Sequence, residues 1–144
     1  MKKKLLFLTI IALFSFIGLR AQNEFITIWK PSNPSATIPG KTPSTSTQVW
    51  FPGVGSSYTI TWEEVGYASH TGTLADVSSS EGNPVLIDFG TPLNPVATDA
   101  AYKVKVSNGS GSFTQIRFLD QGYNNNNNHR NFLGDTEKII EITQ

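Results

Sequence analysis

The chain has 144 residues, with eleven basic and eleven acidic side chains, 11% aromatic residues and no cysteine. The lack of cysteine excludes disulfides, cysteine-ligated zinc and a lipid anchor attached through a cysteine. The length fits one domain with a single core, whose stability must come from apolar burial.

The first 21 residues predict a secretory signal peptide. Lys2, Lys3 and Lys4 precede an apolar run that extends from Leu5 to Leu19, and Ala21 offers a small residue for cleavage. A membrane-spanning helix needs about 20 apolar residues, and this run is shorter. An uncleaved anchor is the alternative. We therefore expect a secreted or cell-surface protein whose mature part is 22–144, with no membrane span after cleavage.

Signal removal makes the remaining chain acidic. Lys2, Lys3, Lys4 and Arg20 leave with it, so seven basic side chains face eleven acidic ones and the net charge becomes about −4. Such a surface attracts neither nucleic acid nor anionic lipid.

The mature chain then predicts a series of short strands, because Thr, Val, Ile and aromatic residues alternate between turn signals. Tyr58, Ile60 and Trp62 fall on one face of the clearest strand. Asn108-Gly109-Ser110-Gly111 predicts a hairpin between two later strands, and the run from Asn124 to Asn128 predicts a flexible loop. The expected strands are 24–30, 47–51, 57–63, 71–77, 84–89, 101–107, 112–119 and 137–142.

Seven or eight such strands indicate an all-β protein, an antiparallel β-sandwich of immunoglobulin-like type. A small barrel is the competing arrangement. Because the first and last strands lie near the two chain ends, we expect either a domain cut out of a longer protein or one built to be joined to a following unit.

Residues with catalytic potential are few. His70 and His129 are the only imidazole bases, and a hydrolase that uses His70 needs a Ser, Thr or Asp oxygen beside it. Glu63 and Glu64 are adjacent on a strand and point to opposite faces, so they do not form a carboxylate pair. We predict no enzyme, no cofactor and no metal.

Two binding alternatives remain open. Asp120, the asparagine run and Asp135 supply oxygen atoms that could bind calcium, although the spacing of a calcium loop is absent. Trp50, Tyr67 and Tyr123 are candidate sugar-binding aromatics, with Phe51 beside Trp50. Trp29 and Trp62 fall on inward faces and are expected in the core.

Three segments resemble bacterial BspA-like leucine-rich-repeat surface proteins, which are typical of Bacteroidetes. FITIWK at 25–30 is similar to an FITTWK opening after the signal. YTITW at 58–62 lies where that family has a Y-x-Y-x-V-D-W strand, and GDTEKIIEITQ at 134–144 resembles the segment that leads into the repeats. A W-G-D-G turn is replaced here by Glu63-Glu64-Val65-Gly66 after Trp62.

The resemblance implies a PKD-like or immunoglobulin-like N-terminal domain, followed by leucine-rich repeats that carry adhesion, and it implies no catalytic residues. We therefore expect a non-catalytic structural or adhesive module, with Thr143-Gln144 as the junction toward repeats if the chain continues. Its partners would be a surface glycan or a host or matrix protein. The alternative is a stand-alone secreted carbohydrate-binding module.

Overall fold

The computed structural model describes residues 24–119 and 132–143, so the predicted signal peptide, Tyr123, His129 and the asparagine run lie outside it. Within these ranges the chain forms eight strands and one short 3₁₀ helix, η1 (Ala97–Asp99). The strands are β1 (Phe25–Trp29), β2 (Gln48–Phe51), β3 (Gly53–Glu64), β4 (Tyr67–Ser79), β5 (Val85–Asp88), β6 (Tyr102–Ser107), β7 (Ser112–Ile116) and β8 (Ile139–Thr143).

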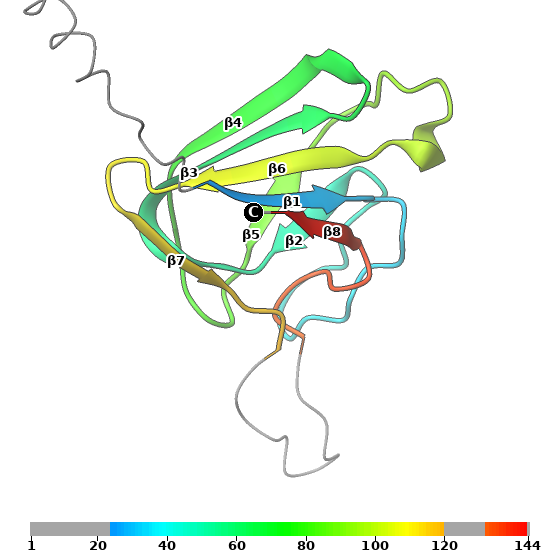
Figure 1. Cartoon of the computed structure of the whole chain (residues 1–144). Coiled ribbons are helices and arrows are strands. Elements are labelled where there is room, and N and C mark those ends of the chain that lie inside the picture. The colour runs from blue at the N-terminus through cyan, green and yellow to red at the C-terminus, as the bar shows by residue number, and fades with distance from the viewer. Residues whose placement is uncertain (1–23, 120–131, 144) are drawn as a thin grey trace, which may run out of the picture.

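The strands form two antiparallel sheets, which confirms the predicted all-β sandwich (Figure 1). The larger sheet has the order β4-β3-β6-β1-β8, with β7 also paired to β3. The smaller sheet consists of β2 and β5, with Val49 opposite Ile87. No helix in the described ranges is long and apolar enough to cross a membrane.

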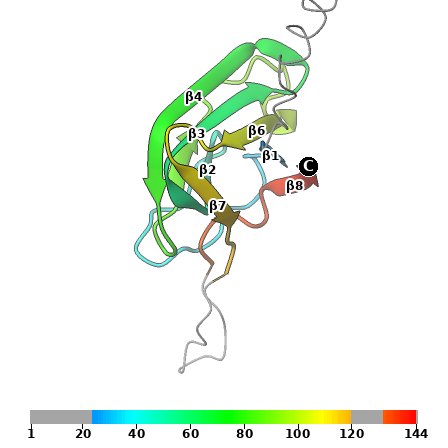
Figure 2. The same cartoon turned by 60° about the vertical axis from the view of Figure 1, so that its left-hand side comes forward.

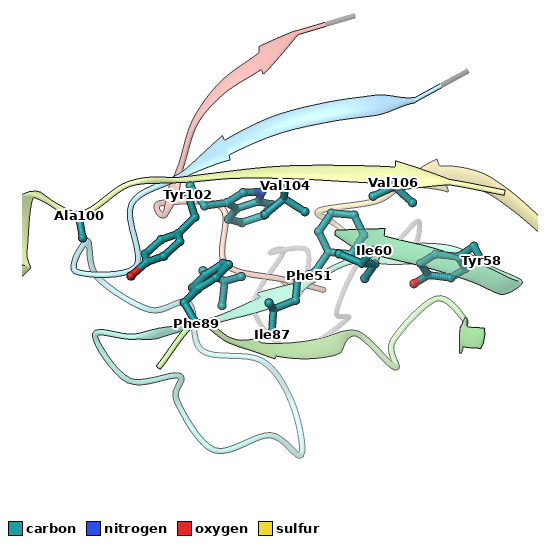
Figure 3. Packing of buried hydrophobic residues seen from close by; sticks show 11 residues of the cluster. Phe51, Tyr58, Ile60, Ile87, Phe89, Ala100, Tyr102, Val104 and Val106 are labelled. Atoms are coloured by element: carbon teal, nitrogen blue, oxygen red, sulfur yellow. The ribbon is translucent and has the colours of Figure 1, made fainter. Parts of the chain in front are cut away.

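The hydrophobic core lies between the two sheets. Figure 3 shows Tyr102, Val104 and Val106 pointing from β6 toward Phe51 and neighbouring side chains of the smaller sheet. Their burial is nearly complete, as is that of Tyr58 and Ile60, so the predicted inward faces of both strands are confirmed. The other fully buried members of the core are Trp29, Val49, Ile87 and Phe89.

The predicted hairpin between 101–107 and 112–119 is wrong. Strand β7 does not pair with β6; both lie along β3, β6 against its second half and β7 against its first. Strand β3 curves between these halves, as Figures 1 and 2 show, and Ser57 has a φ of 47° at that position. The Asn108–Gly111 turn therefore carries the chain around the bend of β3 instead of reversing it onto β6.

Glycine at two positions permits this path. A Cβ on Gly109 would lie 2.8 Å from the carbonyl oxygen of Ser57, and one on Gly111 would lie 2.0 Å from that of Ser56. Larger residues cannot approach the bent strand this closely. The glycines that predict a tight hairpin thus allow the 108–111 turn to lie close to the backbone of Ser56 and Ser57.

Candidate functional site

The predicted sugar-binding aromatics do not form one platform in the described structure. Trp50 lies on β2 in the smaller sheet, and Tyr67 begins β4 in the larger sheet. The Trp50 indole donates to the carbonyl oxygen of Thr42 at 2.9 Å, and the Lys41 ammonium lies 5.1 Å from its ring centroid. Phe51 is fully buried in the core, so its candidacy is wrong.

His70 is bound to a buried carboxylate. Its Nδ1 lies 2.6 Å from Oε2 of Glu64, whose side chain is fully buried. The backbone N–H groups of Leu93 and Asn94 donate to the same carboxylate, each at 2.8 Å. Burial opposes ionisation of Glu64, but the hydrogen bonds from His70, Leu93 and Asn94 outweigh it, and the pKa of the carboxyl is lowered.

This arrangement does not provide a nucleophile. Because an ionised carboxylate only accepts, Nδ1 of His70 is the donor to Glu64. In the ranges that the structure describes, His70 makes no hydrogen bond to a Ser or Thr hydroxyl or to an Asp carboxylate. Glu64 instead ties β4 to the segment that contains Leu93 and Asn94. Glu63 points to the other face and pairs with Lys103, as the strand alternation predicts.

A second buried ionic cluster joins the segment before β8 to the segment before β2. The Asp135 carboxylate is inaccessible and accepts hydrogen bonds from Ala36 N at 2.9 Å, Ser44 Oγ at 2.6 Å and Trp50 N at 2.7 Å. The Lys138 ammonium donates to Ser44 Oγ and to the carbonyl oxygens at 45 and 48. Burial lowers the pKa of Lys138, and the Asp135 charge opposes that shift.

Asp135 is thus a structural carboxylate. Both of its oxygens accept from protein donors, which does not suit a calcium ligand that must face a cation. Asp120 and the asparagine run, the other members of the predicted calcium group, lie outside the described residues. Among the residues placed by the structure, no cluster of three or more His, Asp or Glu side chains could hold a metal ion.

The outward face of the larger sheet carries a groove of about 180 Å³ across β3, β4 and β6. Strand alternation explains this position. Ile60 on β3 and Val104 on β6 point into the core, so their neighbours along each strand, such as Thr61, Lys103 and Lys105, point outward. The register sets Thr61 opposite Thr73 on one side and opposite Lys105 on the other. The lining consists of Thr61, Trp62, Glu63, Thr71, Gly72, Thr73, Lys103 and Lys105.

Charge in this groove is unevenly paired. Lys103 Nζ lies 2.7 Å from Glu63 Oε1, and this contact lowers the pKa of Glu63, which is therefore ionised at neutral pH. Lys105 Nζ lies 3.9 Å from Glu24 Oε2, beyond hydrogen-bond distance. The groove therefore presents one carboxylate acceptor and two ammonium groups in a domain whose net charge is negative.

The comparisons with known proteins return no match: no protein-family model, curated protein or solved structure is similar to this chain. Sequence analysis missed the groove because the lining residues come from three strands, and only the register brings them together. The sequence contains one indication of the groove: Lys103 and Lys105 alternate with the apolar residues of β6, which places both lysines on the outward face.

Proposed function

We propose that the chain is a non-catalytic, exported β-sandwich module that acts in adhesion or as a structural domain at the cell surface. The single observation that carries this proposal is the groove on the outward face of β3, β4 and β6. The inward face of the same sheet is buried in the core, so a partner can contact this sheet only at its outward face, its edges or the adjoining loops.

The buried polar clusters support a non-catalytic role. Glu64 and Asp135 each accept several hydrogen bonds that connect separate segments of the chain, and these bonds leave neither carboxylate free for proton transfer to a substrate. His70 is held by Glu64 with no hydroxyl nucleophile bound to it among the described residues. These groups brace the loops at the ends of the sandwich.

The resemblance to BspA-like surface proteins at 25–30, 58–62 and 134–144 fits this proposal. On that basis the module would precede leucine-rich repeats in a longer surface protein. A stand-alone carbohydrate-binding module is the second candidate, favoured by the half-buried Trp50 indole, which is hydrogen-bonded to Thr42 and lies opposite the exposed Leu86 on the smaller sheet.

An adhesion assay tests the proposal. The chain is purified after export and coupled to fluorescent beads, which are applied to surfaces of purified bacterial glycans and extracellular-matrix proteins. We expect saturable retention on at least one surface, lost when the beads carry heat-unfolded chain. Absence of retention on every surface, or turnover of a substrate in a broad hydrolase screen that His70→Ala abolishes, contradicts the proposal.

A further inference from the structure

We propose that the groove on β3, β4 and β6 is a binding site for an acidic oligosaccharide, meaning a sugar chain that carries carboxylate or sulfate groups. This inference rests on the proposed adhesive function and adds the class of ligand. It follows from the hydrogen-bonding capacity of the lining residues, their charge and the size of the groove.

The groove contains polar groups whose hydrogen-bonding capacity is unused. Thr61, Thr71 and Thr73 line it, and their hydroxyls make no hydrogen bond within the described ranges, although each can donate and accept. Sugar hydroxyls have the same dual capacity. Glu63 adds a carboxylate that accepts from ligand hydroxyls, because it uses one oxygen for Lys103.

The lysines add a requirement for negative charge on the ligand. Lys105 makes no side-chain hydrogen bond in the described part of the chain, and its ion pair with Glu24 is long, at 3.9 Å. Its side chain is 35% exposed, so the ammonium can meet an anion without large desolvation. Lys103 and Lys105 lie two residues apart on one strand face, about 7 Å from each other along β6. That separation suits charges on a polymer better than one small anion.

The size of the groove predicts weak binding per sugar. Its volume of about 180 Å³ holds roughly six water molecules, or one sugar ring, and is below the roughly 300–1,000 Å³ of drug-sized pockets. We expect a Kd on the order of 1 mM for a single sugar residue. A polymer bound by several copies on one surface would be retained far longer through avidity.

Two other polymers fit the groove less well. A neutral polysaccharide leaves Lys105 with only the Glu24 carboxylate, 3.9 Å away. The Trp62 ring, the aromatic member of the described lining, packs against Phe89 and Tyr102 in T-shaped contacts. A polyphosphate would satisfy the lysines and accept from the threonine hydroxyls, but it has no hydroxyl that could donate to the Glu63 carboxylate.

The experiment compares four immobilised polymers with the exported chain as analyte at low ionic strength. Polygalacturonate carries carboxylates, heparin carries sulfates, dextran is neutral and polyphosphate supplies charge without hydroxyls. We expect binding to one or both acidic polysaccharides, weakened at least fivefold by Lys105→Gln and by raising the salt from 50 to 300 mM. The stronger of the two responses identifies carboxylate or sulfate as the preferred group.

Lys41→Gln is the matched control, because it removes the same charge beside Trp50, away from the groove. Its binding should equal that of the unmodified chain. Equal losses from Lys41→Gln and Lys105→Gln, preferred binding to polyphosphate, or no binding to either acidic polysaccharide would overturn the inference. If coupled beads still adhere to other surfaces and Lys105→Gln leaves that adhesion unchanged, the ligand assignment fails while the adhesive function stands.

Discussion

Replacing Asp135 by alanine removes the acceptor for three buried donors at once. Ala36 N, Ser44 Oγ and Trp50 N lose their partner, and the buried Lys138 ammonium loses the nearby negative charge. Because these donors lie in the segments before and within β2, the substitution weakens the link between that region and the approach to β8, which then depends on Lys138 and on the backbone bond from Asp135 N to Trp50 O.

The cost of the substitution follows from the burial of the cluster. Asp135 and Lys138 are 0% and 1% exposed, so water cannot replace the lost contacts without local opening. Leaving a buried charge without its nearby counter-charge costs up to about 3–5 kcal/mol, and an unsatisfied buried donor costs about 1–3 kcal/mol. We expect the free energy of unfolding to fall by about 3–5 kcal/mol, out of roughly 5–15 kcal/mol for a domain.

Urea denaturation followed by tryptophan fluorescence measures this loss. With a slope of about 1–3 kcal/mol per molar urea, the midpoint should fall by roughly 2 M. Asp99→Ala is the control, since Asp99 is 65% exposed and pairs with Lys30 at 3.4 Å on the surface, where such pairs contribute little. Adding Lys138→Met to Asp135→Ala should recover part of the loss, because it removes the uncompensated charge. A midpoint shift as small as that of the control would refute the reasoning.

Three further substitutions have expected outcomes. Tyr102→Phe removes a buried hydroxyl with no hydrogen-bond partner in the described ranges, so we expect urea denaturation at pH 7 to show unchanged or about 1 kcal/mol higher stability. Burial and the Glu64 charge raise the pKa of Tyr102 to about 12, so the unmodified chain loses stability as the pH rises from 10 toward 12, and Tyr102→Phe should reduce that loss. Glu64→Gln should reduce the loss of stability that the chain shows at acid pH. The pKa of Glu64 is lowered on folding, so the carboxylate stabilises the fold above its ordinary pKa of 4.5, and this stabilisation disappears as the pH falls below that value. Gly72→Ala places a Cβ 2.4 Å from the Trp62 ring and should lower stability by about 1–3 kcal/mol with a shift in tryptophan emission.

Each of these has a contradicting result. A Tyr102→Phe protein that is less stable by more than 1 kcal/mol would mean that the hydroxyl has a partner. If Glu64→Gln loses as much stability at acid pH as the unmodified chain does, other carboxyls cause the acid sensitivity. Asp88 is then the next candidate, because hydrogen bonds from Gln48 and Gly90 lower its pKa. Unchanged stability and fluorescence in Gly72→Ala would show that the ring moves freely.

Strand positions and inward faces could be predicted from the sequence because both depend on local alternation. Tyr58, Ile60 and Val104 alternate with polar residues, and the structure buries them as expected. The pairing of β7 could not be predicted in this way. Asn108-Gly109-Ser110-Gly111 has the composition of a hairpin, and only the bend of β3 at Ser57 decides that the chain follows β3 instead.

The polar features of the structure depend on distant contacts and were harder to predict. Asp135 and Lys138 look like solvent-exposed charges in a loop, yet their partners lie about ninety residues earlier in the chain. Glu64 has the sequence context of an exposed strand end, but its partners include a backbone segment 29 residues later. The burial of a charged side chain therefore cannot be predicted from its local sequence, because the groups that bind and cover it come from distant parts of the chain.

The measurement that tests the central claim most directly is an amide chemical-shift titration of the ¹⁵N-labelled chain with an oligogalacturonate and, in parallel, with a heparin-derived oligosaccharide. The account predicts that one of these sugars shifts the amide signals of Thr61, Thr73 and Lys105 on the outward face, and leaves the Trp50 indole signal in place. Shifts centred on Trp50, or no shift with either sugar at millimolar concentration, would contradict it.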